Sequence, residues 1–284
     1  MTQKASGGRL ITTNEGIIDF LDSLSSPQQT VRTGYKKLDS KLGGGLLRGG
    51  LYLVAARPGM GKTSFALNLA ERIKGNVLFV SLEMPHKQLM AKRIARITGI
   101  NSSRLTLGDD FSDAEWDKIA DATQTLSSSG LTVNRRDCNS VSEIGVCARG
   151  IKKLQAIFVD YIGLLRADGA GSRYETVSDN SAALKRLAVS LNVPIIALAQ
   201  LNREAERRDN KRPQLADLRD SGSLEQDADA VLLLYRADYY ANGDADEQKP
   251  SPLEVDIAKN RHAGRGQIGF DAYLPVNRIF EARY

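Results

Sequence analysis

The sequence predicts an α/β fold built on a mainly parallel sheet. Apolar stretches alternate with helical stretches from residue 33 onward. These apolar stretches are continuous rather than alternating, which indicates strands covered by helices on both faces. After Leu253 the apolar residues recur with period two and no helical stretch intervenes, so the last strands are expected to be antiparallel.

The elements of this alternation follow one another in regular order. Strands are predicted over 51–56, 77–82, 131–134, 156–161, 194–200 and 230–235. Helices are predicted over 62–73, 88–97, 113–126, 141–154 and 175–191. The polar segments 166–173 and 203–223 are predicted to be loops. One large domain over 31–284 accommodates all of them, and no internal repeat divides it.

Residues 1–30 are predicted to be a flexible N-terminus that carries one short helix. Thr12 and Glu15 have the spacing of a capping box. Apolar residues then recur on one helical face, at Ile17, Ile18, Leu21 and Leu24, and Pro27 ends the helix. A single amphipathic helix of about ten residues cannot bury its stripe alone. We therefore expect it to fold back onto its own domain or to dock on a neighbour.

Composition excludes several classes of protein. The chain has 284 residues, of which 42% are hydrophobic and 26% charged, as in a soluble globular protein. No apolar run reaches the ~18 residues of a membrane span, so we expect a cytoplasmic protein with no membrane partner. The spacing of Cys138 and Cys147 suits neither a zinc site nor a redox pair. A net charge of +5 permits nucleic-acid binding without requiring it.

The stretch "VAARPGMGKTS" predicts a phosphate-binding loop. It places a strand, a glycine-bearing turn and Lys62-Thr63 at the start of a helix, where turn amides and the helix N-terminus wrap phosphates. The strict motif has glycine where this chain has Ala56. Lys62 is expected on the β/γ phosphates of ATP and Thr63 on Mg²⁺. The predicted nucleotide-binding residues are Ala56, Arg57, Pro58, Gly59, Met60, Gly61, Lys62, Thr63 and Ser64.

Three further strands end in polar residues that face the same edge. Ligands of an open parallel sheet bind beyond the carboxyl ends of its strands, so these residues are expected near the phosphate-binding loop. Asp160 fits a second Mg²⁺ ligand and Glu83 a general base that activates water. Gln200 is expected to sense the γ-phosphate and to relay its loss into the loop that follows.

The stretch "IAKNRHAGRGQIGF" predicts a β-hairpin with a basic tip. Lys259, Arg261, His262 and Arg265 carry no acid among them. Such a tip is either a solvated turn or a group of cations that reaches for an anion. A second basic segment, 203–219, follows Gln200 directly and includes Arg207 and Arg208. Its small residues "RDSGS" suit a grip on a phosphate backbone without base reading.

These motifs together resemble one family. "TGYKKLDSKLGGGL", "AARPGMGKTSFALNLA", "VSLEMP", "VDYIGLL", "VPIIALAQLNREAERRDNKRP" and "LRDSGSLEQDADAVLLLYR" occur in the order of the C-terminal motor of the bacterial replicative helicase DnaB family. The resemblance runs from Thr33 to Tyr284, and Ala56 agrees with it. It implies a RecA-like P-loop NTPase fold and a ring hexamer that moves on single-stranded DNA using ATP and Mg²⁺.

The resemblance also implies roles for individual residues. Lys259 and Arg261 match the cations that enter the neighbouring subunit's nucleotide site, and Arg219, Asp220 and Gly222 match the DNA-binding loop, where Asp220 replaces the usual glutamate. Either Lys92 or Arg93 takes the place of a single family arginine. The family's N-terminal helical domain is expected to be absent, with the Thr12–Leu24 helix at the place of the linker that docks on the next subunit. A helicase loader is then a candidate partner, whereas primase contact is not expected.

Two other functions remain open at this point. A RadA- or RecA-like recombination ATPase shares the core and also favours "LGGGL" before the phosphate-binding loop, but it does not explain "SLEQDADAVLLLYR" followed by "IAKNR". A non-motor ATP-binding regulator of a replicative helicase would bind nucleotide without displacing a DNA strand. ATP hydrolysis with and without single-stranded DNA distinguishes these classes.

Overall fold

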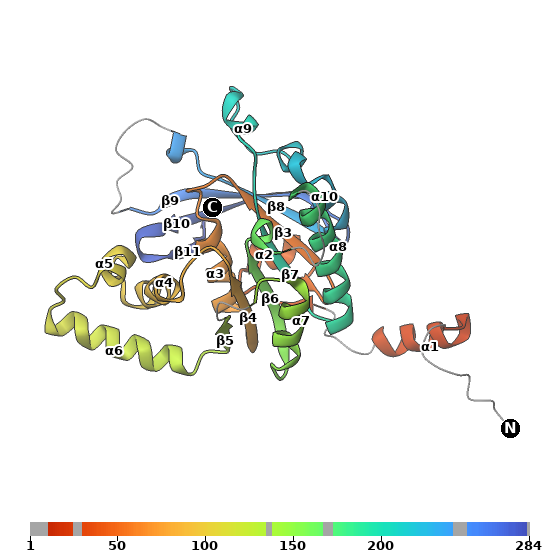
Figure 1. The fold of residues 1–284 in the computed structure, drawn as a ribbon, viewed down its shortest axis with the longest axis horizontal. Helices are drawn as coiled ribbons and strands as arrows, with labels where there is room; N and C mark the ends of the chain where they lie inside the picture. Colours follow the sequence, from red (N-terminus) through yellow and green to blue (C-terminus); the bar gives the residue numbers. More distant parts are fainter. Residues whose placement is uncertain (1–10, 25–29, 135–137, 167–172, 241–248, 283–284) are drawn as a thin grey trace.

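The architecture is a mixed sheet between two layers of helices (Figure 1). The computed structural model describes residues 11–24, 30–134, 138–166, 173–240 and 249–282; of the side chains, those of 173, 174, 205 and 219–222 are also outside the described part. Within it, nine strands form one sheet in the order β11-β10-β9-β8-β3-β7-β6-β4-β5, and β1-β2 form a separate ribbon. Strands β8 to β5 in this order are parallel, and β9, β10 and β11 are antiparallel. This is the predicted α/β class.

The strands have these bounds: β1 Thr30–Val31, β2 Leu46–Leu47, β3 Leu51–Ala56, β4 Asn76–Ser81, β5 Leu131–Val133, β6 Leu154–Asp160, β7 Ile195–Gln200, β8 Ala230–Tyr235, β9 Ser251–Asn260, β10 Gly266–Tyr273 and β11 Arg278–Glu281. The α-helices have these bounds: α1 Thr13–Leu24, α2 Lys36–Lys41, α3 Lys62–Arg72, α4 His86–Thr98, α5 Ser102–Leu107, α6 Asp113–Ser127, α7 Val141–Arg149, α8 Arg173–Leu191, α9 Glu204–Arg207 and α10 Gly222–Asp227. Short 3₁₀ turns are η1 Ile162–Leu164, η2 Leu215–Ser221, η3 Asp238–Tyr240 and η4 Leu274–Val276.

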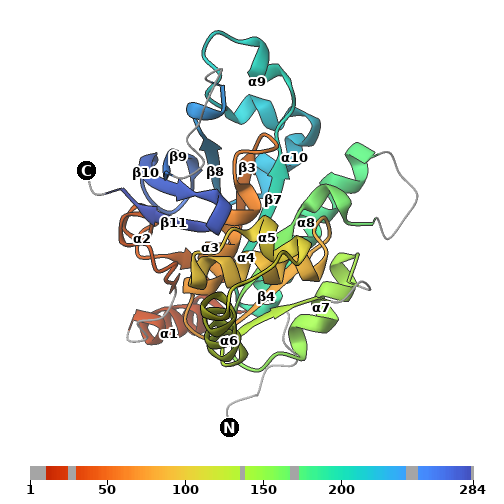
Figure 2. The same ribbon diagram turned by 90° about the vertical axis from the view of Figure 1, so that its left-hand side faces the viewer.

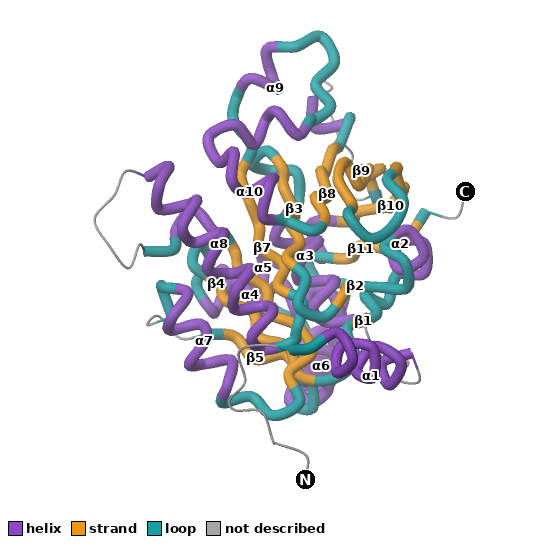
Figure 3. The backbone as a smooth tube through the Cα atoms, turned by 90° about the vertical axis from the view of Figure 1, so that its right-hand side faces the viewer, coloured by secondary structure: helices purple, strands orange, loops and turns teal. Residues whose placement is uncertain are grey.

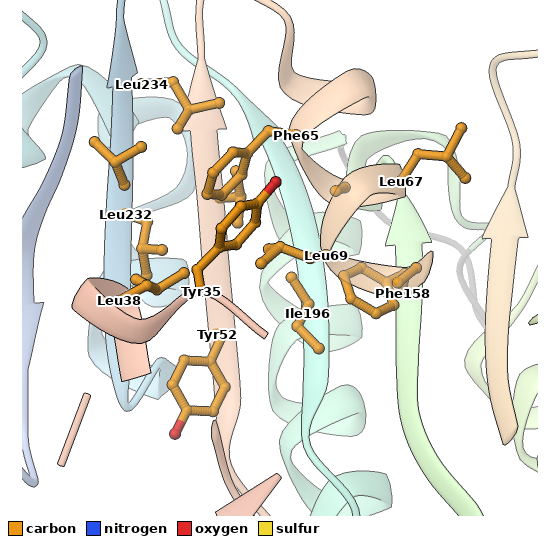
Figure 4. Packing of buried hydrophobic residues seen from close by; sticks show 14 of the residues in the cluster. Tyr35, Leu38, Tyr52, Phe65, Leu67, Leu69, Phe158, Ile196, Leu232 and Leu234 are labelled. Carbon is orange, nitrogen blue, oxygen red and sulfur yellow. The ribbon is translucent and has the colours of Figure 1, made fainter. Parts of the chain in front are cut away.

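The two faces of the sheet bury separate apolar layers. Alternate residues of β3 face opposite sides, so that Val54 packs with α3 residues such as Phe65, whereas Leu53 packs with Leu184 of α8. Figure 4 shows the first layer, in which Phe65 of α3 lies beside Tyr35 over the strands. The tube view of Figure 3 shows α7, α8 and α10 on the other face. Burial on both faces explains why the parallel strands are continuously apolar.

Some predicted boundaries are wrong, and local chemistry explains them. The helix predicted over 141–154 ends at Arg149, because Gly150 and the left-handed Lys153 (φ 53°) interrupt it and β6 begins at Leu154. The segment 203–223, predicted to be a loop, contains α9 and η2 and the first residues of α10. Here Leu218 is buried and holds the chain in short helical turns that no periodicity reveals. Helices α2 and α5 were not predicted because each has only six residues.

Helix α1 stands apart from the rest of the molecule in Figure 1, whereas it overlaps the body in the turned view of Figure 2. The predicted capping box is confirmed, because Thr12 N donates to Glu15 Oε2 at 2.9 Å and Glu15 N donates to Thr12 Oγ1 at 3.3 Å. No residue of α1 is buried, and its apolar stripe is open to solvent. Pro27, predicted to end this helix, lies outside the described residues. Among the described residues, no helix combines the length and apolar character needed to cross a bilayer.

Candidate nucleotide-binding site

The turn between β3 and α3 forms a cradle of backbone amides. Gly59 (φ 82°) and Gly61 (φ 89°) adopt left-handed conformations that favour glycine. A Cβ on Gly59 would lie 2.6 Å from the ring of Tyr239, and one on Gly61 would lie 3.0 Å from Leu274. The backbone of the turn therefore lies close to Tyr239 and Leu274. The amides of the turn and the N-terminus of α3 carry the partial positive charge expected of a phosphate site.

This turn borders a cavity of ≈ 300 Å³ at the carboxyl edge of the sheet. Most of the predicted nucleotide-binding and catalytic residues line it: Arg57, Pro58, Gly59, Gly61, Lys62, Thr63, Ser64, Glu83 and Gln200. Ala56 and Met60 are buried behind it. The cavity is also lined by Met84, Lys92 and Leu274. The parallel sheet therefore brings residues from three separate strand ends to one place.

Asp160 and Thr63 form the acidic side of the site. The Thr63 hydroxyl donates to Asp160 Oδ2 at 2.7 Å. Asp160 is fully buried, and its Oδ1 has no hydrogen-bond partner. Burial raises the pKa of Asp160, against the effect of the Thr63 hydrogen bond and the nearby Lys62. A buried carboxylate oxygen without a partner, next to a threonine hydroxyl, fits a hard divalent cation such as Mg²⁺.

The ammonium of Lys62 lies over an aromatic ring that sequence reasoning missed. Its Nζ is 4.9 Å from the centroid of Tyr161, the residue after Asp160. Burial lowers the pKa of Lys62, and the charges of Asp160 and Glu83 counteract that effect. Tyr161 thus provides a cation–π contact for the ammonium of Lys62. The apolar strand before it gave no signal for this role, since tyrosine is also an ordinary strand residue.

Lys92 and Arg93, between which the sequence did not decide, lie in different environments. Lys92 lines the cavity, its Nζ lies 3.4 Å from Ser64 Oγ, and burial lowers its pKa. Arg93 is buried away from the cavity, where its Nε contacts Glu71 Oε1 at 2.5 Å and its Nη2 donates to Ser129 Oγ at 2.7 Å. Of the two residues, Lys92 is therefore the one that lines the cavity, and Arg93 holds α4 to its neighbours.

Glu83 and Gln200 reach the cavity from the ends of β4 and β7. Glu83 follows β4 in a turn that Ser81 closes by donating from Oγ to the Met84 carbonyl at 2.8 Å. Gln200 ends β7 opposite Ala56 and is exposed. Just beyond it, Arg57 donates to the carbonyl of Leu201 at 2.7 Å and to Glu206 Oε1 of α9 at 2.9 Å. The phosphate-binding turn is thus tied directly to the segment that follows Gln200.

The basic tip (Lys259, Arg261, His262 and Arg265) lies at the amino ends of the parallel strands, opposite the carboxyl ends that border the cavity. Strand β9 runs antiparallel to β8, with Asn260 opposite Ala230, which in turn pairs with Tyr52 near the start of β3. The phosphate-binding turn follows the other end of β3. Five residue steps from Leu51 to Ala56, at about 3.3 Å each, put roughly 17 Å between the two. Lys259 and Arg261 are therefore not brought to the phosphate site of their own chain.

The residues predicted to bind DNA are only partly described. Arg207 of α9 is exposed, and α9 projects beyond the carboxyl edge of the sheet in all three views (Figures 1 to 3). Arg208 donates to both carboxylate oxygens of Asp217, at 2.9 Å and 2.7 Å, and so closes its own loop. The side chains of Arg219 and Asp220 and the surroundings of Gly222 lie outside the described part.

Comparison with known proteins gives the family. The sequence model of the DnaB-like helicase C-terminal domain matches residues 30–279. The replicative DNA helicase DnaB of Geobacillus stearothermophilus is 37% identical over 260 residues, which cover 88% of this chain and 56% of that protein. A probable plasmid replicative DNA helicase of Chlamydia trachomatis is 37% identical over 250 residues, covering 86% and 53%. The chain spans about half the length of the curated relatives it matches.

Solved structures agree with this match. The solved structure of an ATPase domain superimposes with a TM-score of 0.85 at 32% sequence identity. The match covers 96% of this chain and 99% of the chain in that structure. A DnaB-like replicative helicase, studied with its interactions with primase, has the same TM-score and identity and covers 96% of this chain and 69% of its own. These matches do not favour the recombination ATPase or the non-motor regulator. The chain belongs to the family of DnaB-like helicase C-terminal domains.

Proposed function

We propose that this chain is the ATP-hydrolysing motor of a DNA helicase, and that it works as a ring hexamer on single-stranded DNA. One observation carries the proposal: the phosphate cavity and the basic tip occupy opposite edges of one sheet. A head-to-tail arrangement of copies puts the tip of one subunit at the cavity of the next, and such heterologous contacts form a ring when the rotation between subunits closes. The family match supports this arrangement.

Within one subunit, the cradle binds and polarises the triphosphate. The turn amides and Lys62 hold the β and γ phosphates, and Lys92 adds a second positive charge on the α4 side. Glu83 is positioned to orient a water molecule and to accept its proton during attack on the γ-phosphorus. Thr63 and Asp160 are the residues that would hold Mg²⁺, which supplies charge neutralisation when bound.

The neighbouring subunit supplies what the cavity lacks. Charge spreads over the γ-phosphoryl oxygens in the transition state, and an arginine delivered there is worth about 10³–10⁵ in rate. Arg261 is suited to this role because it is half exposed and sits at a hairpin tip. Its fork matches phosphate oxygens, and Lys259 adds a point charge beside it.

DNA contact is assigned to the segment from Leu201 to Gly222, the first residue of α10. Arg219, Asp220 and Gly222 are proposed to grip the backbone of single-stranded DNA, with Arg207 as a peripheral contact. Arg208 is a weaker candidate than Arg207 because Asp217 already binds its guanidinium. We expect backbone tracking with strong salt dependence and no sequence preference.

The proposal is tested by mixing two inactive variants. Glu83→Ala damages the cavity and spares the tip, whereas Arg261→Ala damages the tip and spares the cavity. Each alone should lose ATP hydrolysis stimulated by single-stranded DNA. Mixtures should regain activity at interfaces that combine an intact cavity with an intact tip, and the wild type should displace a duplex strand. Mixtures that stay inactive at every ratio would contradict action between subunits.

A further inference from the structure

The basic tip is fastened to a buried carboxylate outside the hairpin. Arg261 N donates to the backbone carbonyl of Asp229 at 2.8 Å. The side chain of Asp229 faces the same residues: its Oδ1 lies 3.4 Å from His262 Nε2 and 3.9 Å from Arg261 Nη1. Asp229 therefore holds the backbone of the tip, and its carboxylate faces the side chains of Arg261 and His262.

Asp229 is itself fixed from two other elements. Its Oδ2 accepts from Lys185 Nζ of α8 at 2.6 Å and from Leu51 N at the start of β3 at 2.7 Å. In return, Asp229 N donates to the Leu51 carbonyl at 2.8 Å. The residue is 4% exposed. Burial opposes its ionisation, but the hydrogen bonds from Lys185 and Leu51 outweigh this and hold the pKa below its usual value.

The cationic side chains of the tip rest on α10. Lys259 Nζ donates to the Glu225 carbonyl, and Arg261 Nη2 donates to the Gln226 carbonyl at 2.5 Å. These acceptors are uncharged, and the charge of Asp229 is already shared with Lys185. The contacts thus set the direction of the two cations without neutralising them. A guanidinium held in this way remains available to a more negative group, such as a phosphate.

We propose that Asp229 is a positioning residue for the cations that the tip delivers to the neighbouring subunit, with Lys185 fixing the orientation of its carboxylate. This inference rests on the proposed function, in which Lys259 and Arg261 act in the neighbour's site. Misplacing a catalytic group by about 1 Å costs about 10²-fold in rate. Asp229 is not among the residues that line the cavity, so the loss should appear in catalysis and not in nucleotide binding.

The test uses Asp229→Asn in the full chain. Asparagine keeps the shape and can still accept from Leu51 N, but it removes the charge that faces Arg261 and His262. We expect kcat for DNA-stimulated ATP hydrolysis to fall by about 10- to 100-fold, with KM for ATP within about two-fold. Asp271→Asn is the matched control, since Asp271 pairs with Pro252 at the other end of the same hairpin. It should leave kcat unchanged.

Mixing experiments then assign the defect to one side of the interface. Asp229→Asn should regain activity with Glu83→Ala, which supplies an intact tip, and should stay inactive with Arg261→Ala, since every tip is then damaged. The opposite pattern would place the defect in the cavity and overturn the inference. Activity regained in neither mixture would also overturn it, because Asp229 would then hold the fold and not the tip.

Two controls keep the outcome interpretable. Lys185→Met removes the 2.6 Å hydrogen bond to Asp229. Like Asp229→Asn, it should regain activity with Glu83→Ala and not with Arg261→Ala, and its loss of kcat should be smaller. The inference therefore stays testable if Asp229→Asn fails to assemble. If the mixture of Glu83→Ala with Arg261→Ala is itself inactive, the proposed function fails. If that mixture is active and both new variants regain activity with Arg261→Ala, only the role of Asp229 fails.

Discussion

Lys92 and Arg93 are neighbours in the sequence, yet one lines the cavity and the other forms a buried ion pair. Successive residues of a helix point about 100° apart, so only one of the two can face the cavity. The sequence names the pair but not the rotation of α4, which its packing determines. In the structure Lys92 lines the cavity and Arg93 contacts buried Glu71. The two positions therefore predict opposite phenotypes.

Lys92→Ala should weaken nucleotide binding without harming the fold. The ammonium lies beside the phosphate cradle and in contact with Ser64, so its removal takes one positive charge from the site. We expect the Kd for an ATP analogue to rise about ten-fold, equivalent to about 1.4 kcal/mol. Titration with a fluorescent analogue measures this, and Lys92→Arg should restore most of the affinity. An unchanged Kd for Lys92→Ala would exclude it from the site.

Arg93→Ala should instead lower the free energy of unfolding. The side chains of Arg93 and Glu71 are 5% and 4% exposed, so removing the arginine leaves a buried carboxylate without its main partner. Breaking such a pair costs about 3–5 kcal/mol. Arg96, 3.5 Å from Glu71, compensates in part, so we expect the lower end of that range. Denaturant unfolding gives the value, and a loss below about 1 kcal/mol would mean that the pair is no stronger than a surface one.

At the scale of elements, patterns that extend over a whole strand and motifs with a fixed spacing predicted best. The strand 51–56, the hairpin beyond Leu253 and the capping box of α1 appear where the sequence put them. The short helices α2, α5 and α9 were missed because four to six residues carry no readable period. Their positions depend on tertiary contacts, such as the ion pair between Arg57 and Glu206.

That ion pair predicts how nucleotide and DNA are coupled. Arg57 belongs to the phosphate-binding turn and Glu206 to α9, which lies in the segment assigned to DNA. Glu206→Gln removes the charge that ties them. We expect ATP hydrolysis without DNA to stay within about two-fold, while its stimulation by single-stranded DNA falls about three- to ten-fold, as expected for a coupling energy of about 1 kcal/mol.

The control for this coupling lies in the same helix. Glu204 is exposed, and its backbone N donates to Asn202 Oδ1 at 3.1 Å. Glu204→Gln makes the same change of charge two residues away and should keep full stimulation. The measurement is kcat against single-stranded DNA concentration for the three proteins. Equal stimulation in Glu206→Gln and the wild type would show that α9 does not report on the phosphate-binding turn through this pair.

At the scale of the whole molecule, the site divides into a part that sequence can predict and a part that it cannot. Residues at the carboxyl edge of a parallel sheet converge by topology, so Glu83 and Gln200 were predictable from strand ends, and Lys62 from the glycine-bearing turn after β3. Tyr161 and Asp229 were not, because their roles depend on which buried charge they face. The opposite placement of the basic tip follows only from the antiparallel turn of β9 against β8.

Helix α1 makes the last prediction, because its exposed stripe needs a partner that its own chain does not provide within the described residues. Ile17, Leu21 and Leu24 are 51%, 55% and 65% exposed, and α1 stands apart from the body in Figure 1. In the proposed ring this stripe docks on the adjacent subunit. Burying one such side chain is worth about 1.5–3 kcal/mol, so Leu21→Glu should weaken each interface by at least that amount.

The expected result is a loss of assembly with an intact fold. With a non-hydrolysable ATP analogue, the wild type should sediment as a ring, and Leu21→Glu should dissociate at protein concentrations at least ten-fold higher than the wild type. Asp22→Asn, on the polar side of the same helix, is the matched control and should assemble normally. ATP hydrolysis by Leu21→Glu should fall with assembly, since a subunit without a neighbour has a cavity but no tip to complete it. A dissociated variant that keeps full activity would show that one chain is sufficient for hydrolysis.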